Sequence, residues 1–248
     1  MPKVALITGS SRGIGAATAL RLAADGYAVC INFRSNEQAA EKVRAKVAAL
    51  CPKATAIQAD VSLEEDVNRL FTAIDRELGR LDVLVNNAGI LLPQTRVESM
   101  TAERVNQILT TNVTGYFLCS REAVKRMSTK RGGTGGVIVN VSSAAARIGS
   151  GGEYVDYAAS KGAIDTFTVG LAQEVAAEGI RVNGVRPGFI YTDIHADGGE
   201  PDRVDRIKHQ LPLQRGGQAE EVAAAIAWLV SDESSYTTGA FIEVSGGR

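Results

Sequence analysis

The chain has 248 residues, of which 45% are hydrophobic and 22% are charged, as in a globular protein with a substantial core. Its 27 basic and 28 acidic side chains nearly cancel, which excludes the electrostatic footprint of a general nucleic-acid or membrane-surface binder. Three widely spaced cysteines and two histidines offer neither a disulfide framework nor a metal site. The N-terminal apolar run is too short for a signal peptide or a membrane span, so we expect a cytoplasmic protein with reduced thiols.

Short apolar runs alternate along the chain with longer stretches of helical periodicity. The expected strands are residues 4–7, 28–33, 55–58, 81–85, 137–141, 180–185 and 241–244. The expected helices are residues 14–25, 37–50, 63–78, 102–127, 157–178 and 219–229. Most of the runs are continuously apolar, as strands buried on both faces of a parallel sheet should be. Because no linker divides the chain, the pattern predicts one α/β domain over residues 1–248, a doubly wound, seven-stranded parallel sheet with helices on both faces.

A glycine-rich segment, T-G-S-S-R-G-I-G, follows the first expected strand and opens the first helix at residues 8–15. Such glycines permit a tight turn and bring backbone N–H groups at a helix N-terminus close to a pyrophosphate. The order strand, loop, helix therefore predicts a dinucleotide-binding loop. Its expected cofactor contacts are Gly9, Ser11, Arg12, Gly13, Ile14 and Gly15.

The end of the second strand is where NAD-binding folds place an acidic residue on the ribose 2′-hydroxyl. This chain has no acid there and instead reads Asn32, Phe33, Arg34, Ser35. A guanidinium suits a 2′-phosphate, because it donates charge-assisted hydrogen bonds and stacks on the adenine. With Asn32, Arg34 and Ser35 as contacts and Arg12 as a second cation, the sequence predicts NADP(H), with NAD(H) as the weaker alternative.

Tyr157 and Lys161 are four residues apart in a helical stretch and therefore share one helix face. Ser142 and Ser143 end the fifth strand, at the sheet edge where open α/β folds bind ligands. A serine hydroxyl there can hold a carbonyl oxygen while the tyrosine supplies a proton, and a neighbouring lysine favours the phenolate. The spacing taken alone also suits an ordinary surface contact between the tyrosine and the lysine.

Five motifs, taken together and in order, resemble the short-chain dehydrogenase/reductase family. They are T-G-x-x-x-G-I-G at 8–15, N-N-A-G at 86–89, N-V-S-S at 140–143, Y-A-A-S-K at 157–161 and P-G at 187–188. The resemblance covers the whole chain and implies a single-domain Rossmann fold. It also implies an NAD(P)-dependent oxidoreductase that acts on CH–OH groups. By family analogy we expect a homotetramer built on the helices at 102–127 and 157–178.

The resemblance assigns roles to individual residues. Tyr157 would be the general acid/base, and Ser143 would position the substrate oxygen. Lys161 would bind the nicotinamide ribose and lower the pKa of Tyr157, and Asn112 would hold a water that relays protons to Lys161. The further cofactor contacts that it implies are Asp60, Val61, Asn87, Ala88, Gly89, Tyr157, Lys161, Pro187, Gly188, Ile190 and Thr192. The spacing from serine to tyrosine is one residue longer than in many members, which keeps Ser142 as the alternative to Ser143.

The substrate depends on residues 190–212, a long segment expected to be an irregular lid with many charged side chains. Such a cover favours a small carbonyl or alcohol substrate, meaning a sugar, aldehyde or ketone, as in relatives of glucose 1-dehydrogenase. The alternative is a 3-oxoacyl-[acyl-carrier-protein] reductase, whose acidic carrier needs a basic landing surface. Lys125, Arg126, Lys130 and Arg131 supply part of one, although Gln173 stands where that branch often has arginine.

An alternative function, and the roles of the two histidines and the single tryptophan, complete the sequence-based expectations. A non-catalytic NADP-binding redox sensor is the alternative from a different functional class, and a complete set of catalytic residues argues against it. We expect His195 and His209 on the surface or in the lid, because neither has a metal-ligating partner at usable spacing. Trp228 is expected to serve packing, in the core or between subunits.

Overall fold

The computed structural model of the protein describes residues 2–51 and 53–248. Within these residues, seven parallel strands form one sheet in the order β3-β2-β1-β4-β5-β6-β7. The strands are β1 (Val4–Ile7), β2 (Ala28–Phe33), β3 (Ala54–Gln58), β4 (Leu81–Asn86), β5 (Gly136–Val141), β6 (Ile180–Pro187) and β7 (Phe241–Val244). The expected doubly wound sheet is confirmed, and no strand end among the described residues differs from its expected position by more than two residues.

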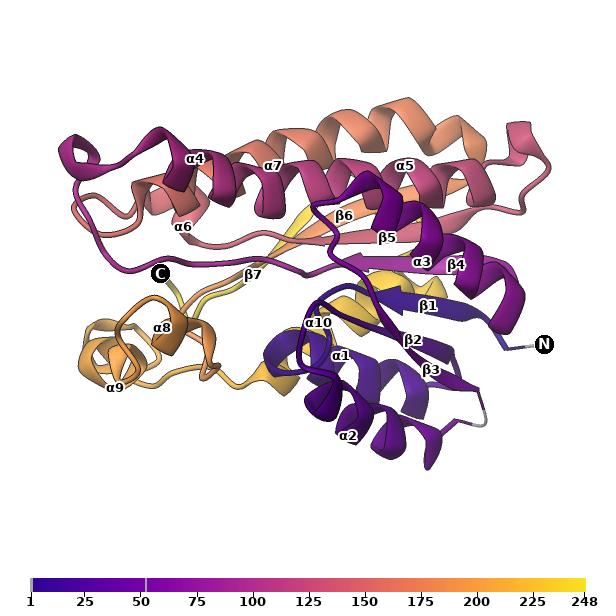
Figure 1. The fold of residues 1–248 in the computed structure, drawn as a ribbon, viewed down its shortest axis with the longest axis horizontal. Coiled ribbons are helices and arrows are strands. Elements are labelled where there is room, and N and C mark those ends of the chain that lie inside the picture. The colour runs from indigo at the N-terminus through magenta and orange to yellow at the C-terminus, as the bar shows by residue number, and fades with distance from the viewer. Residues whose placement is uncertain (1, 52) are drawn as a thin grey trace.

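Helices cover both faces of the sheet (Figure 1). One face carries α1 (Gly13–Ala24), α2 (Glu37–Ala48) and α10 (Ala219–Val230), and the other carries α3 (Glu64–Glu77), α5 (Gly115–Met127) and α7 (Val155–Val175). Successive side chains of a strand point to opposite faces. Ala5 and Ile7 of β1 therefore join the core under α1, whereas Val4 and Leu6 join the core under α3. Burial on both faces explains why the strands are continuously apolar.

The long helix expected at residues 102–127 is interrupted. α4 (Ala102–Leu109) continues through a π-helical turn (Thr110–Thr114) into α5. The turn holds Asn112 fully buried, where its Nδ2 donates to the carbonyl of Ile90 at 3.0 Å and its Oδ1 accepts from the N–H of Ile90 at 2.8 Å. Such turns are frequent at functional sites. The apolar pattern continues through this turn, so it predicts one helix and does not reveal the interruption.

About half of residues 190–212 are helical, so the segment is less irregular than expected. They contain α8 (Ile194–Asp197), α9 (Arg203–Ile207) and a 3-10 helix (Lys208–Gln210). Their buried apolar side chains are Ile190, Val204, Ile207 and Leu211. Several charges pair within the segment, Arg206 with Glu200 and Lys208 with Asp205, each at 2.8 Å. Much of the charge expected to face the substrate is therefore neutralised inside the segment.

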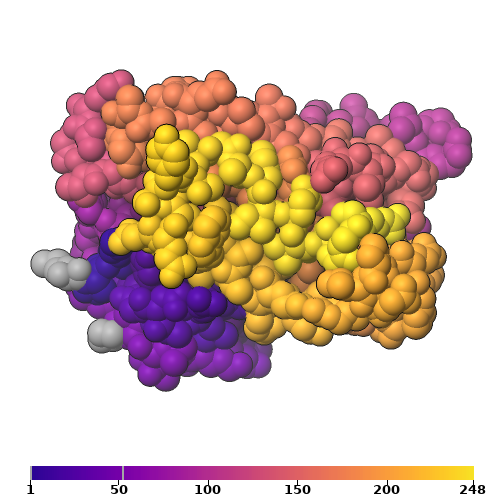
Figure 2. Space-filling view, turned by 180° about the vertical axis from the view of Figure 1, so that it is seen from behind, coloured from indigo at the N-terminus to yellow at the C-terminus, as the bar shows by residue number. Residues whose placement is uncertain are grey.

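The C-terminal end of the chain supports this segment. Figure 2 shows the last residues beside it on the rear face of the molecule. The N–H of Leu213 donates to the carbonyl of Gly246 at 3.1 Å. The helices α8 and α9 lie at the carboxyl edge of the sheet, apart from the two helical layers (Figure 1). In the part of the chain that the structure describes, no helix combines the length and apolar character that a membrane crossing requires.

Candidate active site

A cleft opens at the carboxyl edge of the sheet between β1 and β4. These strands are neighbours, but the chain leaves them toward opposite faces, which is the switch point where open α/β sheets bind ligands. A long cleft of about 390 Å³ follows the loops after β1, β2, β3 and β4. An inner pocket of about 140 Å³ adjoins it, between α7, α8 and the loops after β5 and β6. Among the described residues, Ile14, Asn87, Gly89, Thr192 and Ile194 line both, so the two cavities form one site.

The glycine loop forms one wall of the long cleft. Several of its positions require glycine, because a side chain there would not fit. Gly9 and Gly13 have φ angles of 61° and 55°, in the left-handed region that favours glycine. A Cβ on Gly9 would lie 2.9 Å from the Cα of Ala88, and one on Gly15 would lie 2.6 Å from Nδ2 of Asn87. The loop therefore packs directly against the segment after β4, and the N-terminus of α1 faces the cleft.

Two amide side chains that were expected to contact the cofactor also hold this loop in place. Asn87 donates through Nδ2 to the carbonyl of Thr8 at 2.9 Å, while the Thr8 hydroxyl accepts from the N–H of Asn87 at 2.9 Å. Asn32 is buried, accepts from the N–H of Gly9 at 3.2 Å and donates to the carbonyl of Ala59 at 3.0 Å. Both residues line the long cleft, and their polar atoms fix its walls.

The far end of the long cleft is lined by the expected residues Arg34, Ser35, Asp60 and Val61. Arg34 is exposed and has no ion pair with any residue that the structure describes. Arg12 also lines the cleft, but its guanidinium pairs with Asp197 and, at 3.8 Å, with Asp193. The two arginines are therefore differently engaged: Arg34 is available to a ligand, and Arg12 connects the glycine loop to α8.

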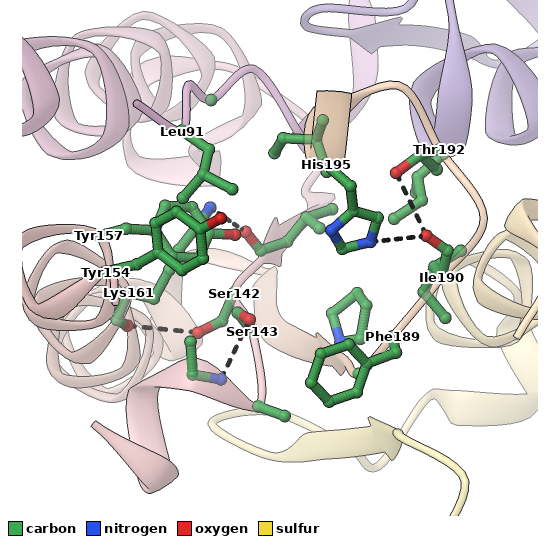
Figure 3. Close-up of a pocket in the computed structure, with 18 of the residues that line it drawn as sticks. Leu91, Ser142, Ser143, Tyr154, Tyr157, Lys161, Phe189, Ile190, Thr192 and His195 are labelled. Carbon is green, nitrogen blue, oxygen red and sulfur yellow. Dashed lines mark hydrogen bonds between the residues drawn. The ribbon is translucent and has the colours of Figure 1, made fainter. Parts of the chain in front are cut away.

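Ser143, Tyr157 and Lys161 meet in the inner pocket (Figure 3). Ser143 follows β5, and its oxygen accepts from the N–H of Ala145 at 3.1 Å. Tyr157 and Lys161 project from successive turns of α7. Burial raises the pKa of Tyr157 to about 12, against the lowering effect of a hydrogen bond with Ser143. At neutral pH the tyrosine is therefore a neutral phenol whose hydroxyl lies beside the serine.

Ser142 is turned away from Tyr157 and bonded to α7. Its hydroxyl donates to Oδ1 of Asp165 at 2.6 Å and contacts the carbonyl oxygen of Lys161 at 3.2 Å. Side chains alternate along an extended backbone, so the two adjacent serines point in different directions. The geometry places Ser143, and not Ser142, beside the phenol.

Lys161 is buried and lies close to the ring of Tyr157 without a hydrogen bond to the tyrosine hydroxyl. Its Nζ donates to the carbonyl of Val141 at 2.7 Å and to the hydroxyl of Tyr116 at 3.2 Å, and lies 5.7 Å from the centre of the Tyr157 ring. Burial lowers the pKa of Lys161 to about 7, with the charge of Asp165 acting in the opposite direction. Desolvation is thus the main influence on the pKa of both groups, because the amine of Lys161 and the phenol of Tyr157 are not hydrogen-bonded to each other.

Asn112 and Lys161 both lie close to Gly89. A Cβ on Gly89 would lie 3.4 Å from Oδ1 of Asn112 and 3.7 Å from Nζ of Lys161. The remaining expected contacts, Pro187, Gly188, Ile190 and Thr192, line the inner pocket. Gly188 is also tightly packed, since its Cβ would lie 2.8 Å from the Cα of Ser245.

Several pocket residues were missed from the sequence. The apolar wall includes Leu91, Ile148, Tyr154 and Phe189, and the polar additions are His195 and Arg203. Phe189 directly follows the P-G motif, and Leu91 lies two residues beyond N-N-A-G, so proximity to a motif was the available signal. His195 was expected on the surface or in the lid; it lies in the lid segment, on α8, and is buried, at 9% exposure, because α8 folds back onto Ile190. His209 is exposed as expected, and Trp228, at 39% exposure, does not lie in the core.

The chain is similar to known proteins over nearly its whole length. A family model described as enoyl-(acyl carrier protein) reductase matches residues 9–248. The uncharacterized oxidoreductase YgfF of Escherichia coli (strain K12) is 64% identical over 245 residues, 99% of each chain. The 3-oxoacyl-[acyl-carrier-protein] reductase FabG of Staphylococcus aureus (strain Mu50 / ATCC 700699) is 37% identical over 247 residues, 100% of this chain and 98% of the relative. The crystal structure of a short chain dehydrogenase from Burkholderia cenocepacia J2315 in complex with NADP matches with a TM-score of 0.90 and 35% identity, covering 99% of this chain and 97% of that one.

Proposed function

The chain belongs to the short-chain dehydrogenase/reductase family of oxidoreductases, and we propose that it uses NADP(H) to interconvert a small carbonyl compound and its alcohol. The observation that carries this proposal is the pairing of Ser143 with the neutral phenol of Tyr157 in a pocket that opens onto a glycine-walled cleft. A carbonyl oxygen placed between the two hydroxyls is held by one and protonated by the other.

The long cleft fits a dinucleotide with a 2′-phosphate. The glycine loop lets the backbone approach a pyrophosphate, and Arg34 at the far end has no competing carboxylate partner among the described residues. Asp60 and Val61 would contact the adenine, and the segment from Pro187 to Thr192 would hold the nicotinamide end. The relative from Burkholderia cenocepacia was solved in complex with NADP, which supports the same choice here. A nicotinamide held there would supply or accept the hydride.

Proton transfer falls to the residues of the inner pocket. Burial keeps Tyr157 protonated at neutral pH, so in the direction of reduction it can donate its proton to the substrate oxygen. Lys161 exchanges protons readily near neutral pH, because burial lowers its pKa to about 7. Asn112, which lies close to Gly89 as Lys161 does, would hold a water that relays the proton to Lys161. These roles follow the sequence-based assignment, with Ser143 as the substrate-positioning serine.

The second candidate is reduction of a 3-oxoacyl group on an acyl carrier protein, favoured by the 37% identity to the Staphylococcus aureus reductase. Within one chain, the basic surface expected to bind the acyl carrier protein lies far from the inner pocket. Lys125 and Arg126 end α5 just before β5 begins, so they lie at the amino edge of the sheet, opposite the inner pocket. Both residues also pair with Glu122. We therefore place the small carbonyl substrate first.

Steady-state oxidation of NADPH tests the proposal, with aldehydes, ketones, sugars and 3-oxoacyl thioesters as substrates. The diagnostic variant is Tyr157→Phe, and the matched control is Tyr154→Phe, whose hydroxyl lies in the same pocket but donates to the carbonyl of Gly198 at 3.0 Å. We expect kcat to fall by ~10²-fold or more in Tyr157→Phe while NADPH binding survives, and to change far less in the control. Retained turnover in Tyr157→Phe would refute the mechanism and favour the redox sensor. Faster reduction of the carrier-bound substrate would put the second candidate first.

We also propose that the protein assembles as a homotetramer through α5 and α7. Phe117 on α5 is 50% exposed and packs on Phe167 of α7 with ring centres 4.0 Å apart, and Val169 is 38% exposed. Such an apolar face gains stability when a second copy covers it. Light scattering should give four times the mass of one chain, and a monomeric mass would refute this assembly.

The cytoplasm is the compartment that suits the cysteines. Cys30, Cys51 and Cys119 are all buried and none forms a disulfide. A reducing compartment preserves such thiols. Fractionation of cells that express the chain should recover it in the cytoplasmic fraction, and recovery from an oxidising compartment would contradict the assignment.

A further inference from the structure

His195 is a buried polar residue that the proposed proton transfer does not use. It lies on α8, is 9% exposed and lines the inner pocket together with Ser143 and Tyr157. Figure 3 shows its ring between Tyr157 and Ile190. Nε2 is bonded to the carbonyl oxygen of Ile190 at 3.0 Å. Nδ1 is buried and has no hydrogen-bond partner among the residues that the structure describes.

The bond to Ile190 determines where the imidazole proton lies. A carbonyl oxygen can only accept a hydrogen bond, so Nε2 must carry the proton and donate it. In a neutral imidazole the second nitrogen is then unprotonated and is an acceptor. Nδ1 of His195 therefore carries a lone pair that no described residue satisfies. A buried acceptor without a donor is unfavourable, and in a native structure such an atom needs an explanation.

The surroundings keep the ring neutral. Burial lowers the pKa of His195, the bond to Ile190 opposes this, the charge of Arg203 lowers the pKa further and that of Glu200 raises it. Arg203 lies in the same pocket, but its guanidinium is paired with Glu153 and Glu200. The balance favours the neutral ring, which makes Nδ1 an acceptor and not a second donor.

We propose that Nδ1 of His195 accepts a hydrogen bond from a hydroxyl group of the substrate. The inference rests on the proposed carbonyl reduction and narrows its substrate class to hydroxyketones and hydroxyaldehydes, with the corresponding diols as the alcohols. A carboxylate has no proton to donate at neutral pH, and an alkyl group would leave Nδ1 unpaired. Neither a keto acid nor a simple ketone therefore satisfies this nitrogen. His195 is a specificity-determining residue in this account, and Tyr157 and Ser143 remain the residues at the reacting oxygen.

The test uses pairs of ketones in which a methyl group replaces a hydroxyl with little change in volume. Hydroxyacetone is paired with 2-butanone, and 4-hydroxy-2-butanone with 2-pentanone, so that the hydroxyl is offered at two distances from the carbonyl. The measured quantity is the ratio of kcat/KM within each pair at saturating NADPH. A polar site discriminates against an analogue that leaves its buried group unpaired, so we expect the wild-type protein to prefer the hydroxyl-bearing member of at least one pair by about tenfold or more.

Two variants separate recognition from support of the fold. In His195→Gln the longer amide reaches the position of Nε2 and can still donate to Ile190, but the acceptor at the Nδ1 position is lost. In His195→Asn the shorter amide keeps an acceptor at the Nδ1 position and loses the bond to Ile190. The exposed His209 provides the control His209→Gln. We expect the ratio to fall to near one in His195→Gln, to survive in part in His195→Asn and to be unchanged in the control.

A purely supporting role, with Nδ1 bonded to water, predicts a different result. His195→Asn would then be the damaged variant, and both members of each pair would lose activity equally. A wild-type ratio of one for both pairs, or an unchanged ratio in His195→Gln, would overturn the proposal. Thermal unfolding of each variant shows whether its fold is intact.

A binding measurement separates failure of this inference from failure of the proposed function. The same ketones are titrated into the NADPH complex of Tyr157→Phe, whose turnover is expected to be slower by ~10²-fold or more, and binding is followed by saturation-transfer NMR. Tighter binding of the hydroxyl-bearing members, lost when His195→Gln is added, supports the recognition role. If the wild-type protein reduces no carbonyl compound, the proposed function is refuted. Equal binding of the two ketones within both pairs would refute the His195 proposal independently of that result.

Discussion

Replacing Arg34 by alanine should weaken the use of NADPH and leave the use of NADH nearly unchanged. Arg34 lines the far end of the long cleft, is exposed and has no ion pair with any described residue, so its replacement breaks no ion pair among them. NADPH differs from NADH only in the 2′-phosphate. A change confined to NADPH therefore reports the contact between that phosphate and this side chain.

The magnitude follows from the exposure of the guanidinium. A hydrogen bond to a charged group contributes about 1.5–3 kcal/mol, which is roughly 10- to 150-fold in affinity. Because Arg34 is exposed, solvent screening favours the lower end of this range. Arg12 is already paired with Asp197 and Asp193, both largely exposed, so we expect Arg12→Ala to have the smaller effect.

The assay is kcat/KM for NADPH and for NADH at a saturating carbonyl substrate and at two ionic strengths. We expect the wild-type protein to prefer NADPH by ~10-fold or more, and Arg34→Ala to lose about that factor. Added salt should reduce the wild-type preference, since it screens the exposed contact. Arg76→Ala, which removes an exposed arginine on α3, is the control for net charge. Equal or better use of NADH by the wild-type protein, or an unchanged ratio in Arg34→Ala, would refute the reasoning.

Three further predictions concern the inner pocket. Ser143→Ala should lower kcat by ~10²-fold with little change in melting temperature. Ser142→Ala removes a buried, hydrogen-bonded hydroxyl, so it should cost about 1–2 kcal/mol of stability and leave most of kcat. The reverse ranking in kinetics and melting would transfer the role to Ser142. Gly89→Ala introduces a methyl group 3.4 Å from Oδ1 of Asn112 and 3.7 Å from Nζ of Lys161, distances that the fold tolerates. Turnover should therefore fall ~10-fold while the melting temperature is unchanged. Unchanged turnover in steady-state assays would exclude a proton path between Asn112 and Lys161. Burial lowers the pKa of Lys161 from 10.5 to about 7, so between these values the unfolded chain binds more protons than the folded one and wild-type stability falls as the pH falls. Lys161→Met should therefore abolish turnover yet raise the melting temperature of the cofactor-free protein, most at pH 7 and least near pH 10; a lower melting temperature at both pH values would contradict the argument.

The sheet could be predicted because its determinants are local. A strand buried on both faces must be continuously apolar, and such runs appear directly in the sequence at β1, β2 and β4. The glycine loop is local as well, since the positive φ angles of Gly9 and Gly13 require a residue without a side chain. Helix periodicity is less informative about interruptions. It predicts one helix where the chain forms a π-helical turn around Asn112, because the stabilising contact to Ile90 comes from a distant loop.

The sequence by itself determined which chemical groups are present and which of them share an element, as Tyr157 and Lys161 share successive turns of α7. Only the tertiary structure decided how these groups face one another. Asp165 of α7 binds the hydroxyl of Ser142 and thereby leaves Ser143 beside the phenol. His195, in a segment of charged residues, is buried because α8 folds back onto Ile190. Orientation, burial and the pKa shifts that follow from burial depend on contacts between residues far apart in the chain, and no local pattern encodes those contacts.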